Sequence, residues 1–253
     1  MIQQIQGNIA ELFKTYKIPA LTLNLPMDNL QNWADVISKR LRLDPEYLYP
    51  KASEFFWSLS HVQLAIGYAL IARQSCEFPR GKKGASYDES SMPDLLDLCD
   101  MHFWYHAFCV RECIYRCWER LAVLLSTACY PNISEKLYFD GIVKKIENDS
   151  NINKINELKL LKKQIKHWNN ASSVRNKLSH HESSPFTKTK IKVEFTDFVG
   201  LNRELIPKYH YLSEDIVQEI EVIKNAYLKL HPAFVDVTKF IEKISEGRTS
   251  GLT

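Results

Sequence analysis

Apolar side chains recur every three to four residues along most of the chain, which is the period of an amphipathic α-helix. The clearest run spans about residues 94–130 and is closed by a proline. A second long run spans about 155–179 and ends in a polar stretch. With only 8 Gly and 10 Pro among 253 residues, a fold of many short strands and tight turns is disfavoured. The pattern therefore predicts an all-α protein, an antiparallel helical bundle.

Shorter helical segments are predicted before, between and after these two runs. They cover about residues 5–13, 28–42, 52–74, 133–147 and 213–230, and a continuation of the last one past Pro232 to Ile244 is left open. Residues 77–93 are rich in Pro, Gly, Ser and Lys and predict a surface loop. This loop suggests an N-terminal helical extension over residues 1–90 and a helical bundle over residues 94–245.

The period changes to two after the second long run. Apolar or threonine residues at 187, 189, 191, 193 and 195 alternate with Lys188, Lys190, Lys192 and Glu194. Such alternation is typical of a half-buried strand, so a small β-hairpin or edge strand is expected as an insert. The three lysines are explained by the solvated face of an edge strand, and they would also suit contact with an RNA backbone.

Charge and cysteine usage limit the classes of function. A formal net charge of +3 is too small for a polycation that binds nucleic acid by bulk charge. The N-terminus has no basic region followed by an apolar run, and the apolar stretch 62–72 is far shorter than the roughly 20 residues of a membrane span. Most of the six cysteines fall in one helical segment, where reduced thiols are expected. These features predict a cytoplasmic protein with no membrane association.

One stripe on the 94–130 segment combines two metal-binding residue types. Its members are His102, His106, Cys109, Cys113 and Cys117, at helical spacing. A transition-metal site is one interpretation. Packing is the favoured one, because leucines and other apolar residues share this side and a buried Cys behaves as a small hydrophobe. Side chains on consecutive turns of one helix also project in parallel, so neither a metal nor a cofactor is expected.

The inward face of the 155–179 segment ends in a cation. Leu158, Leu161, Ile165 and Trp168 define this face, and its continuation reaches Ser172 and then Arg175. A guanidinium at such a position is costly unless a partner is supplied. Arg175 is therefore expected to pair with an acid, or to face a cleft or subunit interface that admits an anion.

His180 follows Arg175 by five positions, near the predicted end of the helix. On an unbroken helix the two side chains would be about 140° apart, so their convergence requires the helix to end near Ser179. A histidine with a pKa near neutrality can move a proton to or from a ribose 2′-hydroxyl. An arginine beside it can stabilise the charge of a pentacoordinate phosphate, and Asn176 can orient a ligand. A simple helix-end role for both residues is the alternative.

The string Arg175-Asn176-Lys177-Leu178-Ser179-His180-His181 at the end of a long helix resembles the Arg-x4–6-His motif of the HEPN superfamily. That resemblance covers about residues 94–245 and implies a HEPN-like bundle in which Arg175 and His180 form the catalytic pair and Asn176 orients the substrate. It implies a metal-independent endoribonuclease that forms a 2′,3′-cyclic phosphate, works as a homodimer, and acts in defence or toxin-like regulation with an antitoxin or regulatory protein as a further partner. Glu112, Glu119 and His181 are additional weaker candidates for the same site.

Some HEPN domains lack activity, so a second interpretation is a non-catalytic helical module that binds nucleotide, RNA or a protein partner. A metal-dependent enzyme built on the His/Cys stripe is the third. The resemblance leaves the role of residues 1–90 unexplained.

Overall fold

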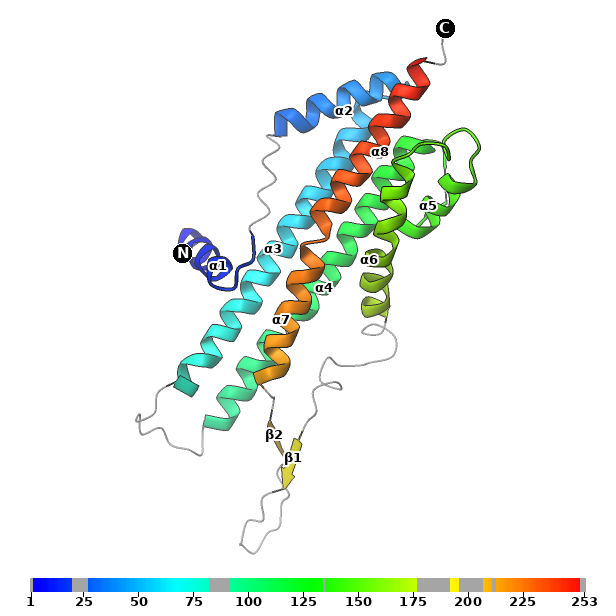
Figure 1. The fold of residues 1–253 in the computed structure, drawn as a ribbon. Coiled ribbons are helices and arrows are strands. Elements are labelled where there is room, and N and C mark those ends of the chain that lie inside the picture. Colours follow the sequence, from blue (N-terminus) through cyan, green and yellow to red (C-terminus); the bar gives the residue numbers. More distant parts are fainter. Residues whose placement is uncertain are drawn as a thin grey trace, which may run out of the picture. The chain divides into compact units, whose positions relative to one another are not determined.

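The structure is a computed structural model that describes residues 2–19, 27–81, 92–133, 135–176, 192–195, 207–210 and 213–250 (Figure 1). Helices make up nearly all of this part of the chain, which confirms the all-α prediction. The helices are α1 (Ile2–Thr15), α2 (Met27–Leu41), α3 (Pro45–Gly81), α4 (Met92–Cys129), α5 (Phe139–Asn148), α6 (Leu158–Asn176), α7 (Ser213–Tyr227) and α8 (Leu230–Ser250).

Helices α3 and α5 have boundaries that differ clearly from the prediction. Helix α3 begins at Pro45 and continues to Gly81, so residues 77–81 are helical although their Pro and Gly predicted a loop. Helix α5 begins at Phe139 rather than near Ile133. Residues 136–138 before it are non-helical, and Tyr138 is extended, with φ −80° and ψ 169°.

Two short strands follow α6 along the chain. Strand β1 (Lys192–Phe195) pairs antiparallel with β2 (Pro207–His210), with Val193 opposite Tyr209. Strand β1 overlaps the end of the predicted 187–195 strand. Residues 187–191 and the connection between β1 and β2 lie outside the described residues, so the predicted hairpin stays a prediction.

The chain forms two compact units, each assembled from three segments. The first unit comprises Met1–Ala20, Gln63–Val110 and Asn176–Lys224, and the second comprises Leu21–Val62, Arg111–Arg175 and Asn225–Thr253. Both units therefore contain segments from the predicted extension (1–90) and from the predicted bundle (94–245).

In the first unit, α1 packs closely against the second half of α3. A Cβ atom added to Gly67 of α3 would lie 2.7 Å from the side chain of Ile9, so only glycine permits this approach. The same half of α3 contacts α4 through Tyr68, whose ring stacks on His106 at 5.5 Å.

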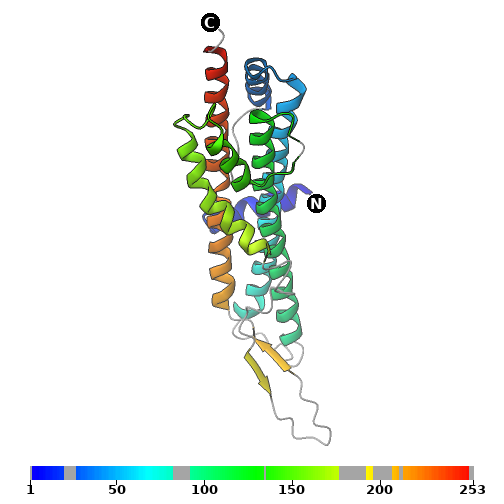
Figure 2. The same ribbon diagram turned by 90° about the vertical axis from the view of Figure 1, so that its right-hand side faces the viewer.

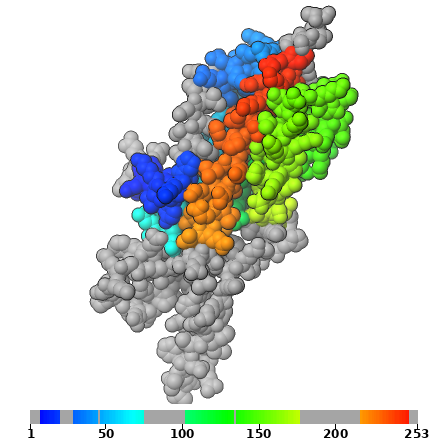
Figure 3. Space-filling model, in the orientation of Figure 1, coloured from blue at the N-terminus to red at the C-terminus, as the bar shows by residue number. Residues whose placement is uncertain are grey.

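In the second unit, aromatic contacts join the helices around one core. Phe55 of α3 stacks on Phe234 of α8 at 4.9 Å, and Trp118 of α4 meets Phe139 of α5 edge-on at 5.1 Å. Helix α2 lies against α8 (Figures 1 and 3). At this contact the indole Nε1 of Trp33 donates to a Glu242 carboxylate oxygen at 2.8 Å. This core fixes the part of α4 that faces α6.

Helix α6 lies beside α4 and α8 (Figures 1 and 2). Glu112 of α4 meets Arg175, whereas Tyr115 meets Trp168, so α4 and α6 run antiparallel. Gln164 on the buried face of α6 donates from Nε2 to Asp236 of α8 at 2.7 Å. The C-terminal end of α6 is therefore placed against the middle of α4.

Candidate functional site

Helix α6 places Arg175 on its inward face, in its last turn. Leu158, Leu161 and Trp168 on the same face are buried, and the Arg175 side chain is 33% exposed. A cation in the last turn also interacts favourably with the carbonyl groups that lack helical partners there. Arg175 thus has an apolar helix face on one side and water on the other.

Two side chains of α4 contact Arg175. Its Nε lies 3.6 Å from Oε1 of Glu112, and its guanidinium carbon lies 5.1 Å from the centre of the Tyr115 ring. The first contact is an ion pair longer than an ordinary hydrogen bond, and the second is a cation–π contact. The predicted acid partner of Arg175 is therefore Glu112.

Glu119 has a different partner. Its Oε1 accepts a hydrogen bond from Nζ of Lys136 at 3.0 Å, and this bond raises the pKa of Lys136. Glu112 and Glu119 are seven residues apart and share one side of α4, which explains why the sequence could not choose between them. The structure brings only Glu112 next to Arg175.

Three aromatic rings continue from Arg175 across the second unit. Tyr115 lies 5.3 Å from Trp168, and Trp168 is stacked with Tyr138 at 5.9 Å with an angle of 19° between the planes. The indole Nε1 of Trp168 donates to Asp140 at 2.9 Å, which fixes the orientation of the ring. We call Tyr115, Trp168 and Tyr138 the aromatic cluster.

Burial, together with the charge of Glu119 and the neighbouring Tyr138, raises the pKa of Tyr115 to about 12. Its hydroxyl is protonated at neutral pH. Tyr115 therefore cannot serve as a general base at neutral pH, and its role next to Arg175 is to support the guanidinium.

The remaining predicted site residues are only partly described. Asn176 is the last residue of α6 and is exposed, and Lys192 opens β1 opposite His210. The predicted residues His180, His181, Lys188 and Lys190 lie outside the described residues. The approach of His180 to Arg175 stays a prediction.

The His/Cys stripe lies on α4 as predicted from its spacing. Cys117 is fully buried and its burial raises the pKa of the thiol, while His106 is stacked on Tyr68 and burial lowers its pKa. In the part of the chain that the structure describes, no group of three or more His, Cys, Asp or Glu side chains is arranged to hold a metal ion.

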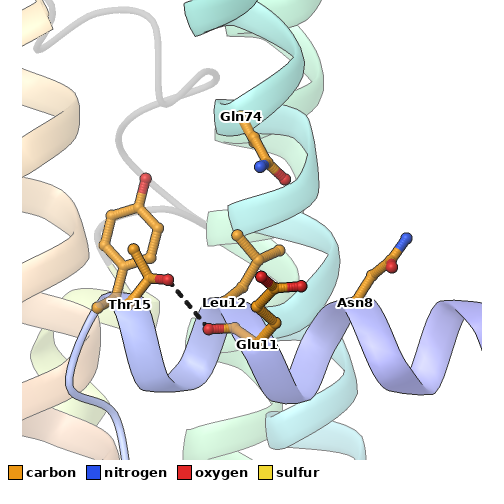
Figure 4. Close-up of a pocket in the computed structure, with 6 residues that line it drawn as sticks. Asn8, Glu11, Leu12, Thr15 and Gln74 are labelled. Carbon is orange, nitrogen blue, oxygen red and sulfur yellow. Dashed lines mark hydrogen bonds between the residues drawn. The ribbon is translucent and has the colours of Figure 1, made fainter.

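A pocket of about 330 Å³ lies in the first unit, between α1 and the second half of α3 (Figure 4). It is lined by Asn8, Glu11, Leu12, Thr15, Tyr16 and Gln74. Thr15 donates from Oγ1 to the backbone carbonyl of Glu11 at 3.1 Å, which occupies one of the few hydroxyl groups in the lining. The pocket contains none of the predicted site residues.

Helix α3 bears on the expectation of no membrane association. Among the described residues one helical stretch, Glu46–Gln74, is long and apolar enough to cross a membrane by length and composition, and an 18-residue window within it has a mean hydropathy of 1.4. This stretch is longer than the 62–72 run considered from the sequence. Length and composition alone are weak evidence for a membrane span, because the core helix of a soluble protein has the same properties. In this protein 39% of the most apolar window is buried.

Comparisons with protein-family models, with curated proteins and with solved structures found no match to this chain. The candidate site therefore rests on its own residues. The sequence singled out Arg175 and gave Glu112 and Glu119 as weaker candidates without choosing between them, and it missed the aromatic cluster. Tyr115 lies three residues after Glu112 on the same side of α4, and that spacing was the one available signal.

Proposed function

We propose that the protein is a metal-independent endoribonuclease of HEPN type, with Arg175 and His180 as the catalytic pair. The observation that carries the proposal is the placement of Arg175: a partly exposed guanidinium in the last turn of α6, held by Glu112 and Tyr115 of α4. An arginine oriented in this way suits the binding of a phosphate group at the helix end where His180 follows.

In the proposed reaction His180 accepts the proton of a ribose 2′-hydroxyl, and the 2′-oxygen attacks the adjacent phosphorus. Arg175 stabilises the additional negative charge of the pentacoordinate phosphate. The bond to the 5′-oxygen breaks, and this oxygen takes up the proton that His180 returns. The products carry a 2′,3′-cyclic phosphate and a free 5′-hydroxyl. Glu112 is a positioning residue that acts through Arg175, and Asn176 orients the substrate.

The proposal also includes the oligomeric state of the enzyme, its contacts with the RNA backbone and its cellular role. A HEPN-like homodimer would bring two Arg175 sites to one cleft, with Lys188, Lys190 and Lys192 contacting the RNA backbone. Activity in a cytoplasmic defence or toxin-like system would require control by an antitoxin or another regulatory protein, because an unrestrained ribonuclease harms its own cell.

The alternative function is a non-catalytic HEPN-like module that binds nucleotide, RNA or a protein partner. The ion pair between Arg175 and Glu112 favours it, because the carboxylate partly neutralises the guanidinium and a purely structural arginine would be held in the same way.

Incubation of the purified protein with single-stranded RNA and excess chelator separates the two functions. Cleavage with cyclic-phosphate ends is expected for the wild type and is expected to be lost in Arg175→Ala and in His180→Ala. Matched controls are Arg40→Ala, in the last turn of α2, and His61→Ala, an exposed histidine of α3. Intact RNA with the wild type, or equal cleavage by Arg175→Ala and His180→Ala, would refute the nuclease.

A further inference from the structure

The aromatic cluster has a cation at each end. The Arg175 guanidinium lies 5.1 Å from the Tyr115 ring centre, and Nζ of Lys136 lies 5.4 Å from the Tyr138 ring centre. All of these residues belong to the second unit. The cluster therefore presents aromatic surface between two positive groups.

The three rings differ in their exposure. Tyr115 is 8% exposed and Trp168 is 3% exposed, whereas Tyr138 is 45% exposed. The two inner rings are part of the core, so packing explains them. Packing does not explain the outer ring, which leaves nearly half of its surface in water.

The exposed ring is held in a fixed orientation. Tyr138 stacks on Trp168, and Trp168 is itself fixed by Asp140. A ring that is already ordered loses little conformational entropy when a ligand stacks on it. Tyr138 is therefore well suited to recognition by stacking.

The charges around the ring indicate the class of ligand. Aromatic clusters can bind cations, but Lys136 and Arg175 would repel one. Each of these cations is paired with a glutamate, Arg175 with Glu112 and Lys136 with Glu119. The cations are more exposed than their partners, 33% against 24% and 68% against 24%, so an anionic ligand in solvent can approach the cations directly. A ligand with a flat π-face and a negative backbone matches both features, and single-stranded RNA has this chemistry.

We propose that Tyr138, supported by Trp168 and flanked by Lys136, is a stacking site for one unpaired base of a single-stranded RNA whose backbone contacts Arg175. This inference rests on the proposed function in taking RNA as the ligand of the Arg175 site. It adds a substrate class, RNA with an unstacked base close to the bound phosphate, and a residue that selects it. Base-paired RNA would be excluded because its bases are already stacked.

Binding is tested with a fluorescently labelled single-stranded RNA oligonucleotide and full-length His180→Ala protein, followed by fluorescence anisotropy. Tyr138→Ala in this background is expected to weaken binding roughly ten-fold or more, the size of effect typical for loss of one stacked base. Tyr138→Phe keeps the ring and is expected to bind like the parent protein. The matched control is Tyr47→Ala, which removes a tyrosine that is 53% exposed in the same unit.

A second measurement couples the ring to the base. Abasic residues are placed one at a time along the oligonucleotide, and at one position the parent protein is expected to lose as much affinity as Tyr138→Ala loses with the intact RNA. At that position Tyr138→Ala should cause no further loss. Affinities of Tyr138→Ala and its parent that agree within about two-fold, or an additional loss at every abasic position, would overturn the inference.

Cleavage assays keep this inference separate from the proposed function. Base-dependent binding through Tyr138 by a wild type that leaves RNA intact would refute the nuclease and retain the stacking site. Cleavage by Tyr138→Ala with unchanged kcat/KM would refute the stacking site and retain the nuclease.

Discussion

The contact between Arg175 and Glu112 can be measured by a double-mutant cycle. At the observed separation of 3.6 Å and an effective dielectric constant of about 20, the gross attraction between two unit charges is about 4 to 5 kcal/mol. The two side chains are 33% and 24% exposed, so desolvation offsets part of this attraction and water screens the rest. The coupling free energy that remains is expected to be about 1 to 2 kcal/mol, between the values for exposed and buried pairs.

The cycle consists of the wild type, Glu112→Gln, Arg175→Gln and the double variant, each unfolded in urea and followed by far-UV circular dichroism. The cation–π contact with Tyr115 is lost in both variants of Arg175, so it cancels from the coupling free energy. Near 1 M salt the coupling is expected to fall, because the screening length is then about 3 Å. As a control, the pair Lys243–Glu246 of α8, whose side chains are 49% and 51% exposed, should show a smaller coupling than the pair Arg175–Glu112. A coupling below about 0.3 kcal/mol at low salt for Glu112 and Arg175 would refute the electrostatic account of how Arg175 is held.

Three further predictions concern the parts that support the site and the first unit. Asp140→Ala leaves the buried indole N–H of Trp168 without its acceptor and is expected to reduce the free energy of unfolding by about 1 to 3 kcal/mol in urea titrations. Gly67→Ala introduces a Cβ 2.7 Å from the Ile9 side chain and is expected to lower the free energy of unfolding by about 1 to 3 kcal/mol. Stability is expected to recover in the Gly67→Ala/Ile9→Ala double variant. A Gly67→Ala protein as stable as the wild type would contradict the close packing of α1 on α3. The pKa of Tyr115 is raised to about 12, so its hydroxyl stays protonated in the folded state at a pH where the same hydroxyl in the unfolded chain, with a pKa of about 10, has ionised. The free energy of unfolding should therefore decline from about pH 10 to 12, and this part of the decline should be absent in Tyr115→Phe.

Most helices could be predicted because one face of each helix is buried, and apolar residues therefore recur at the helical period in the sequence. The start of α5 could not be predicted from this period. Residues 136–138 are non-helical, and there Lys136 pairs with Glu119 and Tyr138 stacks on Trp168. Both contacts are to residues on other helices, α4 and α6. Local helix propensity carries no information about such contacts.

The candidate site was predictable to a similar degree. The inward position of Arg175 follows from the spacing of Leu161 and Trp168 on one helix, so periodicity was sufficient to find it. The acid partner of Arg175 could not be predicted, because Glu112 and Glu119 lie on the same side of α4 and differ only in their position along the helix axis. The choice between them depends on the register between α4 and α6, which no single helix encodes.

The contacts along α4 show what sets that register. Glu112 and Tyr115 of α4 meet Arg175 and Trp168 of α6 in turn, so an acid and an aromatic ring each have a complementary partner on α6. Sliding α6 by one turn would place the guanidinium and the indole out of contact with these partners, and a displaced charge near the core is costly. The same contacts that fix the register therefore also orient Arg175.

A structural arginine needs nothing more than these contacts, so the ion pair alone does not distinguish a ribonuclease from a binding module. Tyr138 is better suited to make this distinction, because its ring is ordered and exposed at the end of the aromatic cluster and is not needed to set the register between α4 and α6. It is at Tyr138, rather than at Arg175, that binding of a ligand can be separated from stability of the fold.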